Sequence, residues 1–374
     1  MAGGRLEQAG EDRSARVESV RALAALGVLV AHVVGATAQA DVPDDLPHRL
    51  LFSGTFAVYP FFVLSGYLLY RPFVRTTYGD APAVDLGRYA RNRALRILPL
   101  YYVVLVVYLV VREGGGSLAQ WLLFGTFSEN FARSTILDVN PVMWSLVIEL
   151  HFYLVLPFLA FAVGRLGGRS LRTGAAIVVG LGVASFALRW VTLYGVSGEP
   201  NPYLRYSLPS SFMYFATGMA LALLRVAWER RPPAALHGWL GASGTWLAAG
   251  AAVWLGMATG RGLGYLAAPA SFLLVGACVL PLRDGAGVRT LDWRPLAVVG
   301  VASYSLYLWH VLVIDQLYQH GVRSLGLLLA ASAPLCVAAA LASYAAIERP
   351  FLRLRRRWAP VPERSARTSR AHAT

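Results

Sequence analysis

The sequence predicts an all-α integral membrane protein, a polytopic bundle of about ten transmembrane helices with both termini in the cytoplasm. Hydrophobic residues make up 56% of the chain, charged residues only 14%, and the mean hydropathy is +0.52. Apolar runs recur at close to the ~20 residues that cross the hydrocarbon of a bilayer. The net charge of +14 is also typical of nucleic-acid-binding proteins. Here, however, the arginines lie mostly in short segments between apolar runs, where they set topology, so no nucleic-acid partner is expected.

Ten apolar segments are predicted to span the membrane. The third is short, and the seventh and eighth are rich in Gly and Ala and separated by only a few residues. Residues 118–127 are apolar but too short to span, so we expect them to lie at the interface or to re-enter the membrane. The ten predicted spans are residues 17–37, 51–70, 95–112, 142–163, 174–194, 208–227, 239–258, 262–281, 297–318 and 326–347.

The arginine distribution fixes the expected orientation. With the N-terminus inside, cytoplasmic segments hold 27 arginines and the remaining seven lie outside or at outer span ends. This asymmetry follows the positive-inside rule and predicts a multi-pass protein of the bacterial plasma membrane. We expect residues 1–16 to be a disordered cytoplasmic tail, residues 17–351 the transmembrane domain and residues 352–374 a basic cytoplasmic tail. A signal peptide cleaved near residues 38–40 is the less favoured alternative, because Arg21 and His32 interrupt its apolar region.

Ionisable residues inside the predicted spans are the first functional candidates, since such groups are costly in hydrocarbon. Arg21 and His32 are 11 residues apart, about 16 Å along one helix face. The rise per residue places His32, Glu149 and His310 about 8, 10 and 12 Å below the outer ends of their spans. Equal depth favours a shared polar cavity. The alternative is that each makes an ordinary interhelical hydrogen bond, as Glu149 would with a hydroxyl such as that of Ser145.

A second candidate is the arginine-rich segment RYARNRALRILP ahead of the third span. Its density is partly explained by the positive-inside rule. Arg93 and Arg96 are three residues apart, so they share a helix face. Together with Arg21 at the same membrane face they could hold the phosphates of a cosubstrate, because guanidinium groups bind phosphate in a bidentate way. The cysteines Cys278 and Cys336 match no disulfide or metal spacing, and no metal site is expected.

Several sequence blocks together resemble the acyltransferase 3 family of membrane O-acyltransferases. They are VRALAALGVLVAH with Arg21 and His32, YPFFVLSGYLL, RNRALRILPLYY with Arg93 and Arg96, MWSLVIELHFYLVLP with Ser145 and Glu149, SYSLYLWH with Tyr307 and His310, and IERPF. The resemblance extends in the same order over about residues 17–351. Ile148 and His151 stand where relatives often have a second acid and Gln, and we expect a short single-domain member without a fused SGNH-type esterase domain.

The resemblance implies a helical membrane domain that takes an acyl group, expected to be acetyl, from cytoplasmic acyl-CoA. The acceptor would be a hydroxyl of a carbohydrate-containing molecule such as a cell-surface polysaccharide. It assigns His32 and Glu149 to catalysis, Arg21, Arg93 and Arg96 to the donor, and His310, with Ser145 and Tyr307, to the site lining. Acyl-CoA would be a cosubstrate, with no permanently bound cofactor, and envelope-biosynthesis proteins are expected partners.

Two mechanisms and three other functions stay open at this stage. His32 could act as a general base toward the acceptor hydroxyl, with Glu149 orienting it, or could carry the acyl group transiently. The acceptor could instead be a macrolide-type secondary metabolite. A proton-coupled transporter would use His32, Glu149 and His310 as a relay, and a non-catalytic scaffold would need none of them. Binding of CoA to the purified protein separates the transporter from the acyltransferase.

Overall fold

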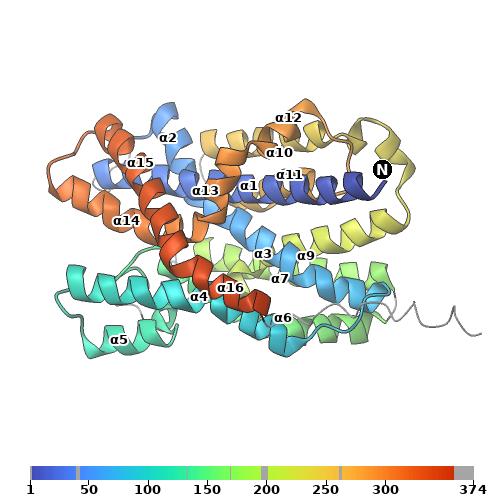
Figure 1. The fold of residues 1–374 in the computed structure, drawn as a ribbon, viewed down its shortest axis with the longest axis horizontal. Helices are drawn as coiled ribbons and strands as arrows, with labels where there is room; N and C mark the ends of the chain where they lie inside the picture. Colours follow the sequence, from blue (N-terminus) through green and yellow to red (C-terminus); the bar gives the residue numbers. More distant parts are fainter. Residues whose placement is uncertain are drawn as a thin grey trace, which may run out of the picture.

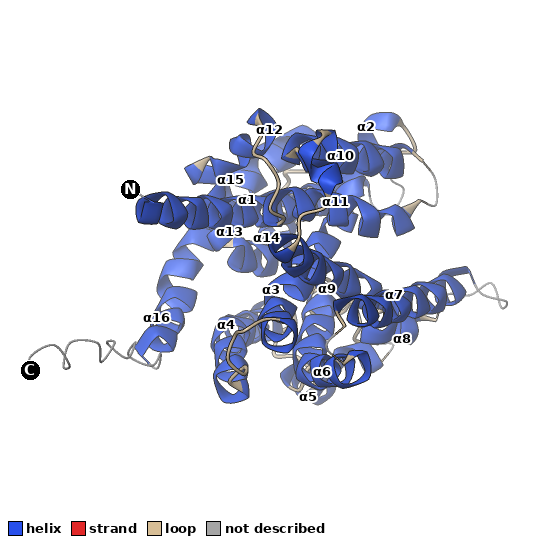
Figure 2. Cartoon of the chain, turned by 90° about the vertical axis from the view of Figure 1, so that its right-hand side faces the viewer, coloured by secondary structure: helices blue, strands red, loops and turns tan. Residues whose placement is uncertain are grey.

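The computed structural model describes residues 2–38, 43–132, 134–168, 170–194, 201–260 and 263–357. Within these ranges the chain is helical almost throughout (Figure 2). The all-α architecture predicted from the hydropathy is therefore confirmed. Its longer helices are α1 (Ala2–Ala38), α3 (Val58–Tyr78), α4 (Leu86–Val107), α6 (Met143–Gly167), α7 (Leu171–Tyr194), α9 (Leu208–Arg230), α10 (Ser243–Thr259), α11 (Ala267–Val279), α14 (Ser303–Gln319) and α15 (Leu325–Ser343).

The predicted count of about ten spans is not confirmed. Among the described residues, seven helices are long and apolar enough to cross a membrane. An eighth span results if α13 (Arg294–Val301) and α14, which meet at a bend of 74°, are counted as one. The predicted seventh and eighth spans are α10 and α11, with 17 and 13 residues, which is short for a full crossing. Large apolar side chains such as Phe158 and Phe161 on α6 are 77% and 72% exposed, as expected of a lipid-facing surface.

Short helices connect the long ones. The apolar segment that was too short to span is α5, closed at its N-terminus by a capping box between Ser117 and Gln120. The other short helices are α2 (Leu46–Phe52), α8 (Pro202–Arg205), α12 (Ala286–Arg289) and α16 (Arg349–Arg357), and α5 covers Leu118–Gly125.

The two predicted tails differ from expectation where the structure describes them. The backbone of α1 is helical from Ala2, where a disordered tail was predicted, while the stretch of α1 that is apolar enough to cross a membrane is Ala15–Ala38. The physical reason is continuity: a formed helix adds residues without a new nucleation cost. At the other end α16 continues to Arg357, and the rest of the predicted basic tail, residues 358–374, lies outside the described residues.

The helices form two parts that meet along a seam. In both views α1, α10 and α15 lie in one part and α4, α5 and α6 in the other, with α3 and α9 between them (Figures 1 and 2). Helix α3 packs on α9 and α11 and also on α1 and α6, so it contacts both parts. The seam is where side chains of α1, α3, α4, α6 and α14 come together.

The central α3–α9 pair depends on glycine at its crossing point. A Cβ atom at Gly218 would lie 1.9 Å from the carbonyl oxygen of Val63, and one at Gly66 would lie 2.2 Å from that of Phe215. Each helix thus supplies a glycine against the backbone of the other. Such small residues permit close packing of membrane helices, which have no hydrophobic force to hold them together in lipid.

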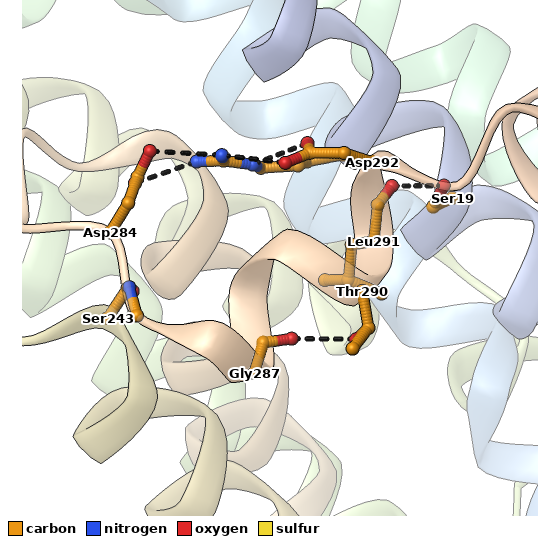
Figure 3. A network of polar contacts seen from close by, with 9 residues as sticks. Ser19, Ser243, Asp284, Gly287, Thr290, Leu291 and Asp292 are labelled. Atoms are coloured by element: carbon orange, nitrogen blue, oxygen red, sulfur yellow. Dashed lines mark hydrogen bonds and ion pairs between the residues drawn. The ribbon is translucent and has the colours of Figure 1, made fainter.

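The start of the first span is held by a polar network. Arg16 is 4% exposed, and its guanidinium donates at 2.7–3.0 Å to the carboxylates of Asp284 and Asp292. Ser19 donates to the carbonyl of Leu291 at 2.6 Å. Figure 3 shows Asp284 and Asp292 on opposite sides of this network. The contacts fix α1, and with it the seam, relative to the segment before α13.

Candidate active site

A cavity of about 110 Å³ lies at the seam. Helices α1, α3, α4, α6 and α14 all contribute side chains to its wall. Six of the residues singled out from the sequence line it: Arg21, Arg93, Arg96, Ser145, Glu149 and Tyr307. We call this space the Glu149 cavity.

Three arginines give one side of the Glu149 cavity a positive charge. Arg21 on α1 is 3.3 Å from the carboxylate of Glu18, one turn earlier. Arg93 on α4 lies over the ring of Tyr153, with its Cζ atom 5.8 Å from the ring centroid. Arg96 follows one turn later on the same face of α4, as the spacing predicted.

Arg96 is positioned by a buried acid that sequence reasoning did not assign. Its Nη1 atom is 3.1 Å from Oε2 of Glu348, whose side chain is 2% exposed. The other Glu348 oxygen accepts a hydrogen bond of 2.6 Å from Ser305 on α14. Glu348 belongs to the IERPF block. Its position at the end of an apolar run is the sequence feature that could have identified it as a site residue. Glu348 does not line the cavity. Its carboxylate neutralises the charge of Arg96 and holds that side chain at the cavity wall.

Glu149 is oriented by two hydroxyl groups. Ser65 on α3 and Tyr153 on α6 each donate a 2.5 Å hydrogen bond to its Oε1 atom. The hydroxyl of Ser145, which the sequence suggested as a partner of Glu149, instead pairs with that of Tyr307 at 2.8 Å and donates to the carbonyl of Val142. Ser145 and Glu149 therefore line the same cavity one turn apart without a hydrogen bond between them.

The two predicted histidines are adjacent. The His32 and His310 ring centroids are 4.9 Å apart at an angle of 76°, and Nε2 of His310 is 3.4 Å from Nδ1 of His32. His32 Nδ1 is also 2.9 Å from the carbonyl oxygen of Val28, and His310 Nδ1 is 3.2 Å from that of Leu306. Both Nδ1 atoms must then carry hydrogen, since a carbonyl only accepts. With both rings neutral, His310 Nε2 accepts from His32, and His32 Nε2 keeps its lone pair.

The histidine pair lies outside the Glu149 cavity. Neither ring lines it, and Glu149 bonds to Ser65 and Tyr153 instead of to His32. Tyr307, one turn from His310 on α14, has its ring centroid 5.9 Å from that of His310 and 6.1 Å from that of Phe61. Tyr307 and Phe61 both line the cavity, so they form the wall beside the histidines. The expected single cluster of His32, Glu149 and His310 is thus two adjacent groups.

Charged groups near the histidines come from α14 and the segment after α4. Asp315, five residues beyond His310, interacts electrostatically with His32 and lies 3.5 Å from Arg112. Arg112 also donates to the carbonyl of Val139 at 2.9 Å, which ties the segment after α5 to this end of α14. His151, the departure noted in the sequence, lies elsewhere, with its ring centroid 5.7 Å from that of Phe131.

The same segment holds a buried carboxyl group between spans. Glu129 is 0% exposed, and its Oε1 atom accepts a 3.4 Å hydrogen bond from the Tyr101 hydroxyl. Burial raises the pKa of Glu129 to about 8, with the Tyr101 hydroxyl acting weakly in the opposite direction. The group is therefore protonated in the folded protein at neutral pH.

Comparison with known proteins identifies the family of the chain. Residues 14–348 match the acyltransferase domain of the acyltransferase 3 family, and the chain belongs to that family. It is thus a multi-pass membrane protein of an acyltransferase class. No solved structure matches the chain.

Relatives place the chain among proteins named for O-acetylation and nodulation. It is 27% identical over 328 residues to YrhL of Bacillus subtilis (strain 168), covering 80% of this chain and 48% of that protein. It is 27% identical to Nodulation protein 10 of Rhizobium leguminosarum bv. viciae, covering 82% and 84%. It is 24% identical to the peptidoglycan O-acetyltransferase OatA of Listeria monocytogenes, covering 80% and 49%. The chain therefore spans about half the length of two of these relatives.

Proposed function

We propose that this protein is a membrane O-acetyltransferase that moves an acetyl group from cytoplasmic acetyl-CoA to a hydroxyl of a cell-surface polysaccharide. The observation that carries the proposal is the convergence of Arg21, Arg93 and Arg96 on one cavity with a single lining carboxylate, that of Glu149. Guanidinium groups bind phosphate through charge-assisted hydrogen bonds, so this wall suits the phosphates of CoA. The arginine asymmetry of the loops supports a cytoplasmic position for it.

The histidine tautomers supply the proton chemistry of the proposal. His32 Nε2 has the free lone pair, because its Nδ1 hydrogen is held by Val28 and His310. His32 then takes the proton of the acceptor hydroxyl as the oxygen attacks the thioester carbonyl. The C–S bond breaks, the acetyl group stays on the acceptor oxygen, and His32 returns the proton to the CoA thiolate.

Glu149 acts at the donor side in this mechanism. Its carboxylate, fixed by Ser65 and Tyr153, balances the arginines and orients the end of the donor in the cavity. The acetyl group must pass Tyr307 and Phe61 to reach His32, so the mechanism requires these two side chains to move when the donor binds.

The donor site is tested with the protein reconstituted in nanodiscs and supplied with radioactive acetyl-CoA and polysaccharide. Arg93→Gln should raise the KM for acetyl-CoA about tenfold or more, the effect of losing hydrogen bonds to a charged group. Arg88→Gln is the matched control, since Arg88 lies on the same helix but outside the cavity and pairs with Asp85 at 3.7 Å. Equal effects of the two variants would contradict the donor site.

The catalytic base is tested by His32→Ala. We expect transfer to be abolished while acetyl-CoA binding, measured by calorimetry, is unchanged. Full transfer activity in this variant would overturn the mechanism.

A further inference from the structure

A second cavity, of about 430 Å³, lies where α2, α7, α8, α9, the end of α10 and the segment before α11 surround the start of α3. Three arginines line it, and none of the described lining residues is acidic. The remaining wall is rich in aromatic rings, including Phe56, Tyr59, Trp190, Tyr214 and Tyr265. We call it the Arg205 cavity.

The three arginines at the cavity wall are each held by a local contact. Arg205 has its Cζ atom 5.4 Å from the ring centroid of Tyr206. Arg189 donates to the Tyr59 hydroxyl at 2.7 Å. Arg49 donates to the carbonyl of Thr259 at 2.7 Å and lies 3.7 Å from Asp44, which is 49% exposed.

Aromatic side chains connect the Arg205 cavity to the Glu149 cavity. Tyr59, in the first, is one turn from Phe62, in the second, and their ring centroids are 6.1 Å apart. A second set of rings starts at Tyr206, the neighbour of Arg205, and runs to Trp144 at 5.0 Å and from Trp144 to Phe62 at 6.5 Å. Trp144 directly precedes Ser145 of the Glu149 cavity. Packed rings on α3 and α6 therefore link the two cavities.

We propose that the Arg205 cavity binds the acceptor, as a sugar residue that bears an anionic group, either a carboxylate or a phosphate. Aromatic rings bury the apolar face of a sugar ring, and guanidinium groups pair with the anionic substituent. The residues that line this space combine both requirements. The inference rests on the proposed function and adds the class of acceptor and the cavity that binds it.

The test measures binding without any donor, so that it is independent of acetyl transfer. The full-length protein in nanodiscs is titrated calorimetrically with three related amino sugars: N-acetylglucosamine, N-acetylmuramic acid and N-acetylglucosamine 1-phosphate. The first is neutral, the second carries a carboxylate and the third a phosphate, so the comparison identifies the source of the anionic group. At least one anionic sugar should bind about tenfold or more tightly than the neutral sugar, as expected for charge-assisted hydrogen bonds.

Variants assign the binding to this cavity. Arg205→Gln should remove the preference for the anionic sugar, and Arg205→Lys should keep part of it. Arg323→Gln is the matched control, because Arg323 lies 5.7 Å over Tyr318 in the same type of contact but does not line the cavity. Binding and its preference should be unchanged there.

The outcomes separate the two proposals. Equal affinity for neutral and anionic sugars, or an unchanged preference in Arg205→Gln, would overturn the acceptor site. A preference that depends on Arg205 supports it even if the wild-type protein transfers no acetyl group, a result that would refute the proposed function alone.

Discussion

Replacing His310 by Leu tests how far the histidine pair contributes to catalysis. Leu has a similar size and suits a site that is 1% exposed, so the substitution mainly removes the Nε2 acceptor. The lost contact is the 3.4 Å approach to His32 Nδ1, which is long for a hydrogen bond. The 2.9 Å contact of His32 with Val28 remains and still fixes the tautomer.

The expected fall in kcat follows from the loss of the His310 contact alone. A weak hydrogen bond contributes about 0.5–1.5 kcal/mol. Since each 1.36 kcal/mol is tenfold in rate, kcat should fall about twofold to tenfold. The KM for acetyl-CoA should stay unchanged, because none of the three donor arginines contacts His310. Steady-state kinetics in nanodiscs, with acetyl-CoA varied at saturating acceptor, measure both constants.

Two further variants decide whether the reasoning holds. His310→Asn keeps an acceptor in the form of the amide oxygen and should recover part of kcat. His151→Leu changes a histidine on α6 outside the cavity and should leave kcat and KM unaltered. A fall in kcat of more than about a thousandfold in His310→Leu would refute a positioning role, because a loss that large exceeds any single positioning hydrogen bond.

Three other substitutions test the fold around the site. Gly218→Ala should lower the melting temperature of the solubilised protein, because its Cβ would lie 1.9 Å from the Val63 carbonyl oxygen and overpacking costs about 1–3 kcal/mol. The control Gly180→Ala, whose Cβ would meet nothing within 4 Å, should lower the melting temperature far less. Equal losses in the two variants would contradict the role of Gly218 at the helix crossing. Arg16→Ala should lower the free energy of unfolding by about 2–3 kcal/mol in a denaturant titration. Breaking a fully buried ion pair costs about 3–5 kcal/mol, and the two aspartate partners of Arg16 are partly solvated, which reduces the cost. An unchanged denaturation midpoint would show that the network is dispensable. Glu129 has a pKa raised above its unfolded value, so its contribution is favourable at low pH and is lost as pH rises from about 4.5 to about 8. Glu129→Gln should therefore flatten the fall in melting temperature between pH 5 and pH 8, and an unaltered slope would refute this assignment.

The donor side of the site was largely predictable from the sequence. Arginines at a membrane face are restricted to the ends of spans, and a spacing of three puts Arg93 and Arg96 on one helix face. Once Arg21 was assigned to the same face, a shared wall of three arginines was the expected arrangement, and its use as a phosphate site stays a proposal. The structure places all three on the Glu149 cavity.

The relation of His32 to Glu149 was not predictable in the same way. Depth along a span can be estimated from the rise per residue, but the direction around the helix toward a particular neighbour depends on tertiary packing. His32 faces α14, where His310 lies, while Glu149 faces the hydroxyls of Ser65 and Tyr153. Equal depth therefore did not produce one cluster.

The number of spans is not confirmed for a related reason. Hydropathy recognises apolar runs, but α10 and α11 pack against each other and are shorter than a full membrane crossing. The Arg205 cavity is likewise invisible to pattern reading, because its arginines come from three distant segments. Each of them could be explained singly as an outer-loop charge.

The wall between the two groups of site residues has a chemical consequence. In the proposed mechanism the donor thioester lies in the Glu149 cavity, and Tyr307, which contacts both Phe61 and His310, stands between that cavity and the histidine pair. The proposed base would then be unable to activate water against the donor until Tyr307 moves. Tyr307 is tied to Ser145, whose neighbour Trp144 contacts both Phe62 and Tyr206. If the acceptor enters among these rings, as proposed above, its binding would disturb the contacts that hold Tyr307 and would favour transfer to the acceptor over hydrolysis of the donor.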